Sequence, residues 1–177
     1  MTPSRTAKVR DVLAITRLRR LEPVAPLAAR VTTGIVFIAH GVEKLMDGTA
    51  GFSGWIASRG VPAPQLTGWL VALLETFGGL FLVLGLLSRL TSTALTVLLS
   101  FAIALGNSHI GFLTPLSGEA RGAGIEFPLV MIGALHVVMF AGPGALSLDR
   151  LLGLEVCAEG SRSRRARGVS SPMRPSA

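Results

Sequence analysis

The chain has 177 residues, of which 50% are hydrophobic and only 15% are charged, and its mean hydropathy is +0.59. A soluble domain carries roughly a quarter of charged residues, and the apolar residues here form long segments, so we expect an all-α integral membrane protein. The net charge of +7 does not indicate nucleic-acid binding, because the basic residues gather toward the two ends of the chain, where they serve as membrane topology signals.

The two ends of the chain differ from its apolar centre. Residues 1–23 are basic and carry apolar residues at roughly helical spacing, which predicts an amphipathic helix on an anionic membrane surface or else a partly disordered arm. A cleavable signal peptide is not favoured, because a long basic lead precedes the apolar region. Residues 153–177 are rich in arginine, serine and proline and are predicted to be disordered.

The centre of the chain, residues 24–152, is predicted to form one domain, a four-helix transmembrane bundle. Its apolar segments must be helical in lipid, because the bilayer offers no water to satisfy backbone groups. At ~1.5 Å per residue each segment spans roughly 25–30 Å, which is enough for a bilayer core. The predicted spans are residues 24–42, 68–87, 90–106 and 125–142. They are joined by a long loop at 43–67, a tight turn at 88–89 and a second long loop at 107–124.

The positions of the basic residues predict the orientation. Of the 17 lysines and arginines, the two long loops contain only Lys44, Arg59 and Arg121. The positive-inside rule therefore predicts an inner-membrane protein whose termini are both cytoplasmic and whose long loops face outward. Arg30 and Arg89 then lie near the cytoplasmic interface, and we expect the Arg30 side chain to extend toward the lipid headgroups.

Polar side chains from all four spans converge on the outer half of this topology. They are His40, Lys44, Glu75, His109 and Glu126. Glu75 is the most informative, because a carboxylate in hydrocarbon costs ~2.5–3.5 kcal/mol and therefore usually faces the bundle interior. Lys44 is its natural counter-charge, with His40 or His109 as hydrogen-bonding partners. The cluster is either a proton or ligand site or a structural ion pair that sets the helix register, and the sequence favours neither.

Small residues are predicted to let neighbouring helices approach Glu75. Gly78 and Gly79 follow it at i+3 and i+4, and Gly85 lies two turns beyond Gly78. His136 lies deeper in the fourth span, where a hydrogen bond between helices is its expected role. A haem held by two histidines at equal depth is not favoured, and no metal-binding spacing or nucleotide-binding motif occurs. The single cysteine, Cys157, excludes dithiol chemistry within one chain.

Four motifs in order make the chain similar to a known family. They are "GIVFIAHGVEKL", a loop with "RGVPAP", "LLETFGGLFLVLGLLSRL", and "GIEFPLVMIGALHVVMFAGPGALSLDRLL". Over about residues 24–152 this pattern resembles the DoxX family of small four-helix bacterial membrane proteins. The family's recurrent positions correspond here to Arg30, His40, Gly41, Lys44, Glu75, Gly78, Gly79, Gly85, Arg89, Glu126 and the segment 142–149.

The resemblance implies a four-helix transmembrane bundle, with Gly41 among its packing glycines. The wider group includes a subunit of a thiosulfate:quinone oxidoreductase, and some actinobacterial members are associated with membrane complexes that handle oxidative stress and thiols. Because the sequence contains no flavin fingerprint, haem pair or dithiol, a redox role would require a bound quinone or a protein partner that carries the cofactor.

Three functions follow as hypotheses. The first is a redox-complex subunit with an outer-leaflet polar pocket, which is not expected to be catalytic by itself. The second is a non-enzymatic scaffold, or a binder of lipid or small solutes, in which the polar cluster only specifies packing. The third, a channel or transporter, is least favoured, because four spans without an inverted repeat would have to form a homo-oligomer.

Overall fold

The computed structural model describes residues 23–106, 111–113 and 124–154. Within these residues the chain is helical and contains no strand. The helices are α2 (Val24–Met46), α3 (Ala50–Ser58), α4 (Pro64–Leu84), α5 (Ser88–Leu105), α6 (Glu126–Ala141) and α7 (Leu148–Leu151). The basic arm before residue 23, His109, most of the second long loop and the tail that contains Cys157 lie outside the described residues, so what the sequence predicts for them stays a prediction.

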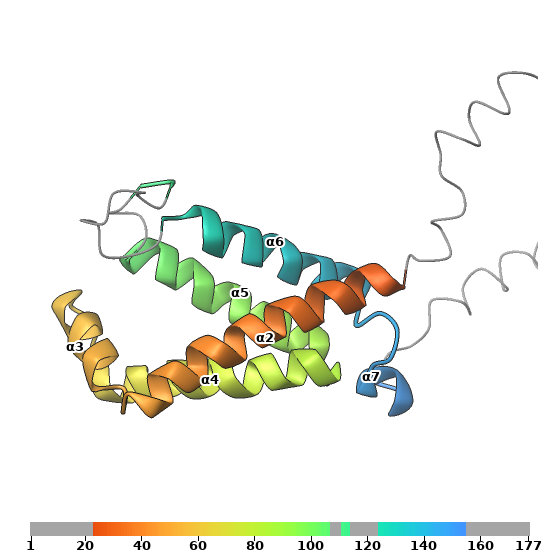
Figure 1. Cartoon of the computed structure of the whole chain (residues 1–177), viewed down its shortest axis with the longest axis horizontal. Helices are drawn as coiled ribbons and strands as arrows, with labels where there is room; N and C mark the ends of the chain where they lie inside the picture. The colour runs from red at the N-terminus through yellow and green to blue at the C-terminus, as the bar shows by residue number, and fades with distance from the viewer. Residues whose placement is uncertain (1–22, 107–110, 114–123, 155–177) are drawn as a thin grey trace, which may run out of the picture.

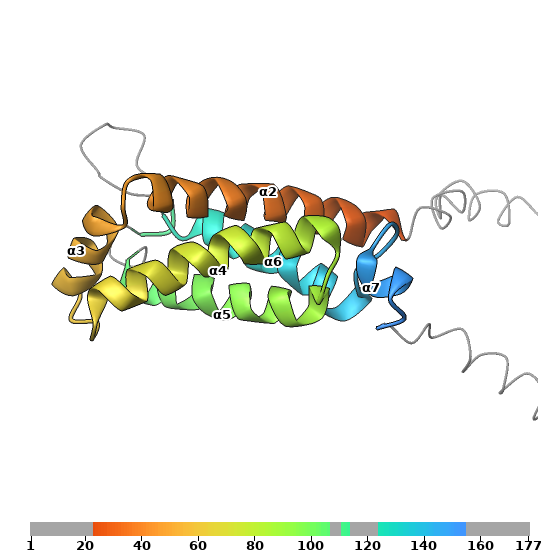
Figure 2. The same ribbon diagram turned by 90° about the horizontal axis from the view of Figure 1, so that it is seen from below.

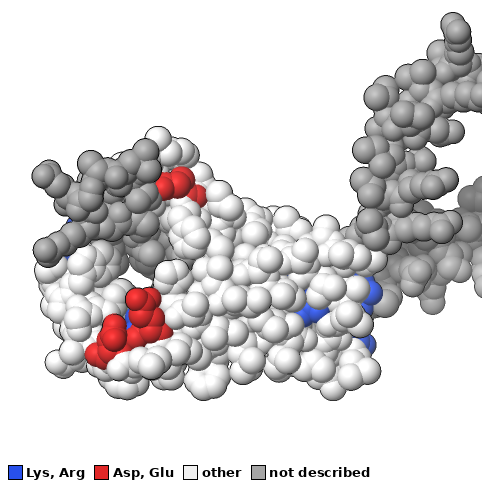
Figure 3. All heavy atoms as spheres, viewed as in Figure 1, with Lys and Arg blue, Asp and Glu red and all other residues white. Residues whose placement is uncertain are grey.

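Four of the helices run lengthwise beside one another, with α3 at one end and α7 at the other (Figures 1 and 2). Helices α2, α4 and α5 are long and apolar enough to cross a membrane, and α6 is a shorter apolar helix of 16 residues. Their shared core contains Phe37, Leu82, Leu95, Met131, Leu135 and Val138. On the face shown in Figure 3, charged side chains gather toward the two ends and the surface between them is uncharged.

The closest helix packing joins α2 to α4 and depends on glycine. A Cβ atom added at Gly34 would lie 2.7 Å from the Gly79 carbonyl oxygen, and one added at Gly79 would lie 2.6 Å from the Gly34 carbonyl oxygen. Seven residues further along α2, a Cβ at Gly41 would lie 2.9 Å from the Ala72 carbonyl oxygen. The two backbones therefore touch along two turns. Gly78 faces the other way, toward the side chain of Leu95 on α5.

Two connections differ from the prediction. The expected loop at 43–67 contains the last turn of α2 and the whole of α3, whose buried Ser53 and Ile56 hold it against the bundle. The expected turn at 88–89 lies earlier, at residues 85–87, and Ser88 is already the first residue of α5. Gly85 is the reason, because it ends α4 in the left-handed conformation with φ +69°. Gly85 consequently terminates a helix, and its missing side chain leaves room for Arg30 of α2, since an added Cβ would lie 2.6 Å from Arg30 Nη1.

Arg30 is buried, and the prediction that it extends to the lipid headgroups is wrong. Its side chain has no exposed surface, and its guanidinium donates to four carbonyl oxygens. Two belong to the last turn of α4, Leu82 at 3.0 Å and Val83 at 2.7 Å. The other two belong to the segment that follows Gly144. They are the carbonyl oxygens of Ala145, at 2.9 Å, and of Leu146, at 2.5 Å. The planar fork of donors thus joins the last turn of α4 to the segment after Gly144.

Asp149 completes this end of the bundle. Its carboxylate accepts hydrogen bonds from the backbone N–H groups of Leu87 at 2.6 Å and Ser88 at 2.8 Å, where α5 begins. The N–H of Asp149 in turn donates to the Gly85 carbonyl oxygen at 2.9 Å. An acidic side chain is favourable at a helix N-terminus, where N–H groups have no intrahelical acceptor. We call this end of the bundle the Arg30 end, and the opposite one, which carries α3, the Lys44 end.

The glycine contact between α2 and α4 gives a prediction. Gly79→Ala should lower the free energy of unfolding by about 1–3 kcal/mol, because the new methyl group meets backbone atoms that cannot move aside. The matched control is Gly133→Ala, where a Cβ would meet nothing within 4 Å. Thermal unfolding of both variants in mild detergent measures the difference, and equal melting temperatures would contradict the close contact.

The Arg30 cluster gives a second prediction. Arg30→Lys should lower the free energy of unfolding by about 2 kcal/mol, because one ammonium group cannot reach four carbonyl oxygens and leaves buried acceptors without donors. Arg89→Lys is the control, since the exposed Arg89 donates to the Met139 carbonyl oxygen at 2.9 Å and should tolerate lysine. The same unfolding measurement applies, and an unchanged Arg30→Lys protein would refute the role assigned to the fork.

Candidate functional site

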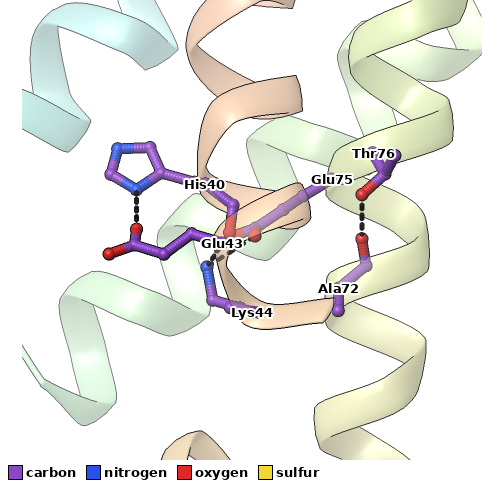
Figure 4. Close-up of polar contacts among 6 residues, drawn as sticks. All are labelled: His40, Glu43, Lys44, Ala72, Glu75 and Thr76. Atoms are coloured by element: carbon purple, nitrogen blue, oxygen red, sulfur yellow. Dashed lines mark hydrogen bonds and ion pairs between the residues drawn. The ribbon is translucent and has the colours of Figure 1, made fainter. Parts of the chain in front are cut away.

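Lys44 and Glu75 form a close ion pair at the Lys44 end of the bundle (Figure 4). The Lys44 Nζ atom lies 2.6 Å from Glu75 Oε2 and 3.4 Å from the His40 carbonyl oxygen. Both side chains are largely buried, with 19% of the lysine and 11% of the glutamate exposed. A charge-assisted hydrogen bond of this length offsets part of the cost of withdrawing both charges from water.

The helix geometry explains why these two side chains meet. Side chains of an α-helix point toward the N-terminus of their own helix. Because α2 and α4 are antiparallel, Lys44 points toward the bundle centre and Glu75 points toward the Lys44 end, so they approach one another. Gly41, one turn before Lys44, brings the α2 backbone against Ala72 and Thr76 of α4. Thr76 itself is occupied, since its hydroxyl donates to the Ala72 carbonyl oxygen at 2.8 Å.

Two other predicted site residues, His40 and Glu126, lie at the same end of the bundle, beside the ion pair. His40 is exposed, and its Nδ1 atom lies 3.9 Å from Oε2 of the exposed Glu43. Its ring meets that of Phe127 edge to face at 6.1 Å between centroids, which brings the start of α6 beside α2. Glu126, the first residue of α6, is half-buried and donates its N–H to the Phe112 carbonyl oxygen at 3.0 Å. His109 lies outside the described residues.

The ion pair forms part of the wall of an apolar pocket of about 460 Å³. Helices α4 and α5 diverge from their tight turn toward the end where α3 lies (Figure 1). The pocket occupies the space between these three helices. Its other lining residues are Phe52, Trp55, Ile56, Val61, Thr67, Val71, Leu98, Leu99, Phe101, Ala102 and Leu105. Pockets of roughly 300–1,000 Å³ with apolar walls and a few polar groups are typical of small-molecule sites.

Aromatic residues of α3 close the pocket at the Lys44 end. Phe52 and Trp55 stack at 5.9 Å between centroids, and the Lys44 Nζ atom lies 5.1 Å from the centroid of the Phe52 ring. The Trp55 ring lies against Gly106 at the end of α5, where an added Cβ would be 2.7 Å from it. The Arg59 guanidinium lies 5.3 Å from the centre of the Trp55 ring. These contacts hold α3 across the opening between α4 and α5.

Sequence reasoning missed this aromatic wall. The segment was predicted to be a polar loop, although Phe52, Trp55 and Ile56 recur at i, i+3 and i+4, the spacing of one helical face. That spacing could have identified α3. The α5 residues of the pocket gave no such signal, because apolar residues occur all round a membrane helix.

The deeper histidine contacts an aromatic ring of its own helix. The ring of His136, which is half-buried on α6, stacks on Phe140 with 5.6 Å between centroids. In the part of the chain that the structure describes, no group of three or more histidine, cysteine, aspartate and glutamate side chains could hold a metal ion.

Fold and site together define a small helical membrane protein with an apolar pocket and a buried ion pair at one end. The DoxX family model matches residues 25–108. The inner membrane protein YphA of Escherichia coli is 35% identical over 134 residues, which cover 72% of this chain and 90% of that protein. The chain belongs to the DoxX family.

Two further relatives extend the comparison. The inner membrane protein YqjF of Escherichia coli is 33% identical over 76% of this chain and 97% of its own length. CatD of Bacillus subtilis, whose assigned name proposes an oxidoreductase, is 30% identical over 71% of this chain and 85% of its own length. No solved structure shows significant similarity to the chain.

The ion pair gives a third prediction. Lys44→Met should lower the free energy of unfolding by about 3 kcal/mol, because it leaves the Glu75 carboxylate buried without a counter-charge. The double variant Lys44→Met/Glu75→Leu should recover most of that loss, since it removes both charges. Glu43→Gln is the control, because that carboxylate is exposed. Unfolding curves that showed the double variant to be the least stable of the set would argue against the pair.

Proposed function

We propose that this protein is the membrane subunit of a redox complex and that its pocket binds a quinone headgroup. The pocket with the Lys44–Glu75 pair in its wall is the observation that carries the proposal. A quinone, when bound, accepts two electrons and two protons. The described residues offer no group that carries electrons, so the electrons would come from a partner protein that holds its own redox cofactor.

The residues of the pocket fit such a headgroup. Phe52 and Trp55 offer aromatic faces for a planar ring, and Val71 and Leu99 offer apolar surface for an isoprenoid chain. The Lys44 ammonium has three N–H donors, of which Glu75 takes one at 2.6 Å. A remaining donor could be offered to a carbonyl oxygen of the ligand. Glu75 is within reach of the same ammonium and could accept or return a proton there.

The membrane arrangement forms part of the proposal. We propose that α6, although shorter, crosses the bilayer with α2, α4 and α5, and that both termini are cytoplasmic. The distribution of lysine and arginine in the sequence supports this orientation. The Lys44 end and its pocket would then face outward, in the inner membrane that the names of the two Escherichia coli relatives specify. The oxidoreductase name of the Bacillus subtilis relative is consistent with the redox role.

A second candidate is a non-enzymatic binder of lipid or of small apolar solutes. The lining residue Phe101 favours it, because 61% of this side chain is exposed on the outer surface of α5. The pocket therefore has an apolar side toward the bilayer, through which an acyl chain could enter. Competition between a fatty acid and a quinone for the pocket distinguishes the two candidates.

The test uses the only two tryptophans of the chain, Trp55 and Trp69. Trp69→Phe leaves Trp55, in the pocket wall, as the sole fluorophore. A soluble short-chain benzoquinone should then quench its fluorescence saturably, and the double variant Lys44→Met/Glu75→Leu should weaken binding by about tenfold, the effect of losing the charge-assisted hydrogen bond that Lys44 offers to the ligand.

Ala102→Phe should abolish the saturable phase by filling the pocket. Ala104→Phe is the matched control, because Ala104 is exposed on the same helix and does not line the pocket. Quenching that rises linearly with quinone concentration and is equal in both variants would mean collision in the micelle and would overturn the proposal. Displacement of the quinone by a fatty acid at lower concentration would favour the lipid-binding candidate.

A further inference from the structure

A second, smaller cavity of about 230 Å³ lies beside the pocket at the Lys44 end. Its lining residues are Glu43, Lys44, Asp47, Thr49, Gly51 and Phe52. Glu43 and Asp47 are exposed, and on the face shown in Figure 3 acidic side chains gather at this end. Water occupies cavities that are polar and roomy enough, and each molecule takes about 30 Å³ of liquid volume. The smaller cavity therefore has the size and the lining of a site for several water molecules.

The two cavities share two wall residues, Lys44 and Phe52. The Lys44 Nζ atom lies 5.1 Å from the centre of the Phe52 ring and 2.6 Å from Glu75 Oε2. Glu75 itself lines only the larger pocket. Lys44 and Phe52 therefore form the wall at which the smaller cavity adjoins the Lys44–Glu75 pair.

The two cavities have opposite chemistry. The larger is lined almost entirely by apolar side chains, and Phe101 gives it a surface toward the bilayer. The smaller one has two carboxylates, a buried threonine and a glycine. An apolar ligand would partition into the first, while water and protons would favour the second.

We propose that the smaller cavity is a water-filled route by which protons reach the Lys44–Glu75 pair from the Lys44 end, separate from the path of the apolar ligand. When the Lys44 ammonium gives up a proton toward the larger pocket, its nitrogen takes up another proton from water in the smaller cavity. That proton arrives directly or through Glu43 or Asp47. Only N–H and O–H bonds change, and no electron moves within this chain. His40, 3.9 Å from Glu43, is the further titratable group at this wall.

This inference deepens the proposed function, because a site that reduces a quinone needs protons while the ligand fills the pocket. Water access to Lys44 can nevertheless be tested without any quinone. The chain has two lysines, Lys8 and Lys44, so Lys8 provides an internal reference. Reductive methylation of the folded protein with a small water-soluble aldehyde, followed by mass spectrometry, gives the rate at Lys44 relative to Lys8.

Two substitutions block one cavity each. Gly51→Phe fills the smaller cavity and should lower the relative rate at Lys44 by about tenfold, because it removes the aqueous approach. Gly54→Phe is its matched control: both glycines lie on α3, a Cβ at either meets nothing within 4 Å, and Gly54 lines neither cavity. Ala102→Phe fills the larger pocket and should change the relative rate by less than about twofold.

The opposite pattern, slow labelling in Ala102→Phe and normal labelling in Gly51→Phe, would overturn the inference, as would equal rates in all variants. Failure of the quinone titration with the predicted labelling pattern would remove the proposed function and leave the water route in place. Saturable quinone binding with the opposite labelling pattern would keep the function and remove the route.

Discussion

The backbone contact between α2 and α4 is the constraint on which the rest of the molecule depends. A methyl group on either Gly34 or Gly79 would meet the backbone of the other helix, and Gly41 repeats the contact two turns further along α2. Such contacts fix the antiparallel register, because a shift by one residue would place a side chain against backbone. The register then sets Arg30 beneath the Leu82 and Val83 carbonyls at one end and Lys44 beside Glu75 at the other.

The two ends of this helix pair solve the problem of a buried charge in different ways. The Arg30 guanidinium donates hydrogen bonds to four carbonyl oxygens, and the nearby carboxylate of Asp149 accepts hydrogen bonds from two backbone N–H groups. The Arg30 end is closed by these hydrogen bonds between side chains and backbone, which hold the turn after α4, the start of α5 and the segment after α6 together. The Lys44 ammonium meets one carboxylate oxygen closely and one carbonyl at 3.4 Å, and it lies between two cavities. The Arg30 guanidinium is thus committed to backbone carbonyls, while the Lys44 ammonium retains a donor that faces a cavity.

Much of the fold could be predicted from the sequence, because lipid permits few structures and hydropathy identifies the spans. The pairing of Lys44 with Glu75 was also accessible, since topology puts them at one level and a buried carboxylate needs a counter-charge. The burial of Arg30 could not be predicted, because its acceptors are the backbone carbonyls of residues 82–83 and 145–146. Every residue has a backbone carbonyl, so the pattern of side chains does not show which ones will accept. The sequence predicted a polar pocket around Lys44 and Glu75, but it did not predict the apolar walls, because these result from the divergence of α4 and α5, a tertiary property that no local spacing encodes.

The glycine contacts also bear on whether the Lys44–Glu75 pair is only structural. A buried ion pair is at best weakly stabilising, and its best-attested structural use is to select one register among several. Here the register of α2 against α4 is already fixed by backbone contact at Gly34, Gly41 and Gly79 and by the hydrogen bonds of Arg30. A second register device would be redundant, and packed apolar side chains in its place would cost less desolvation. On the proposed function, the cost of holding two charges in the wall of an apolar pocket is explained by the ligand of that pocket, and not by what the helices need in order to pack.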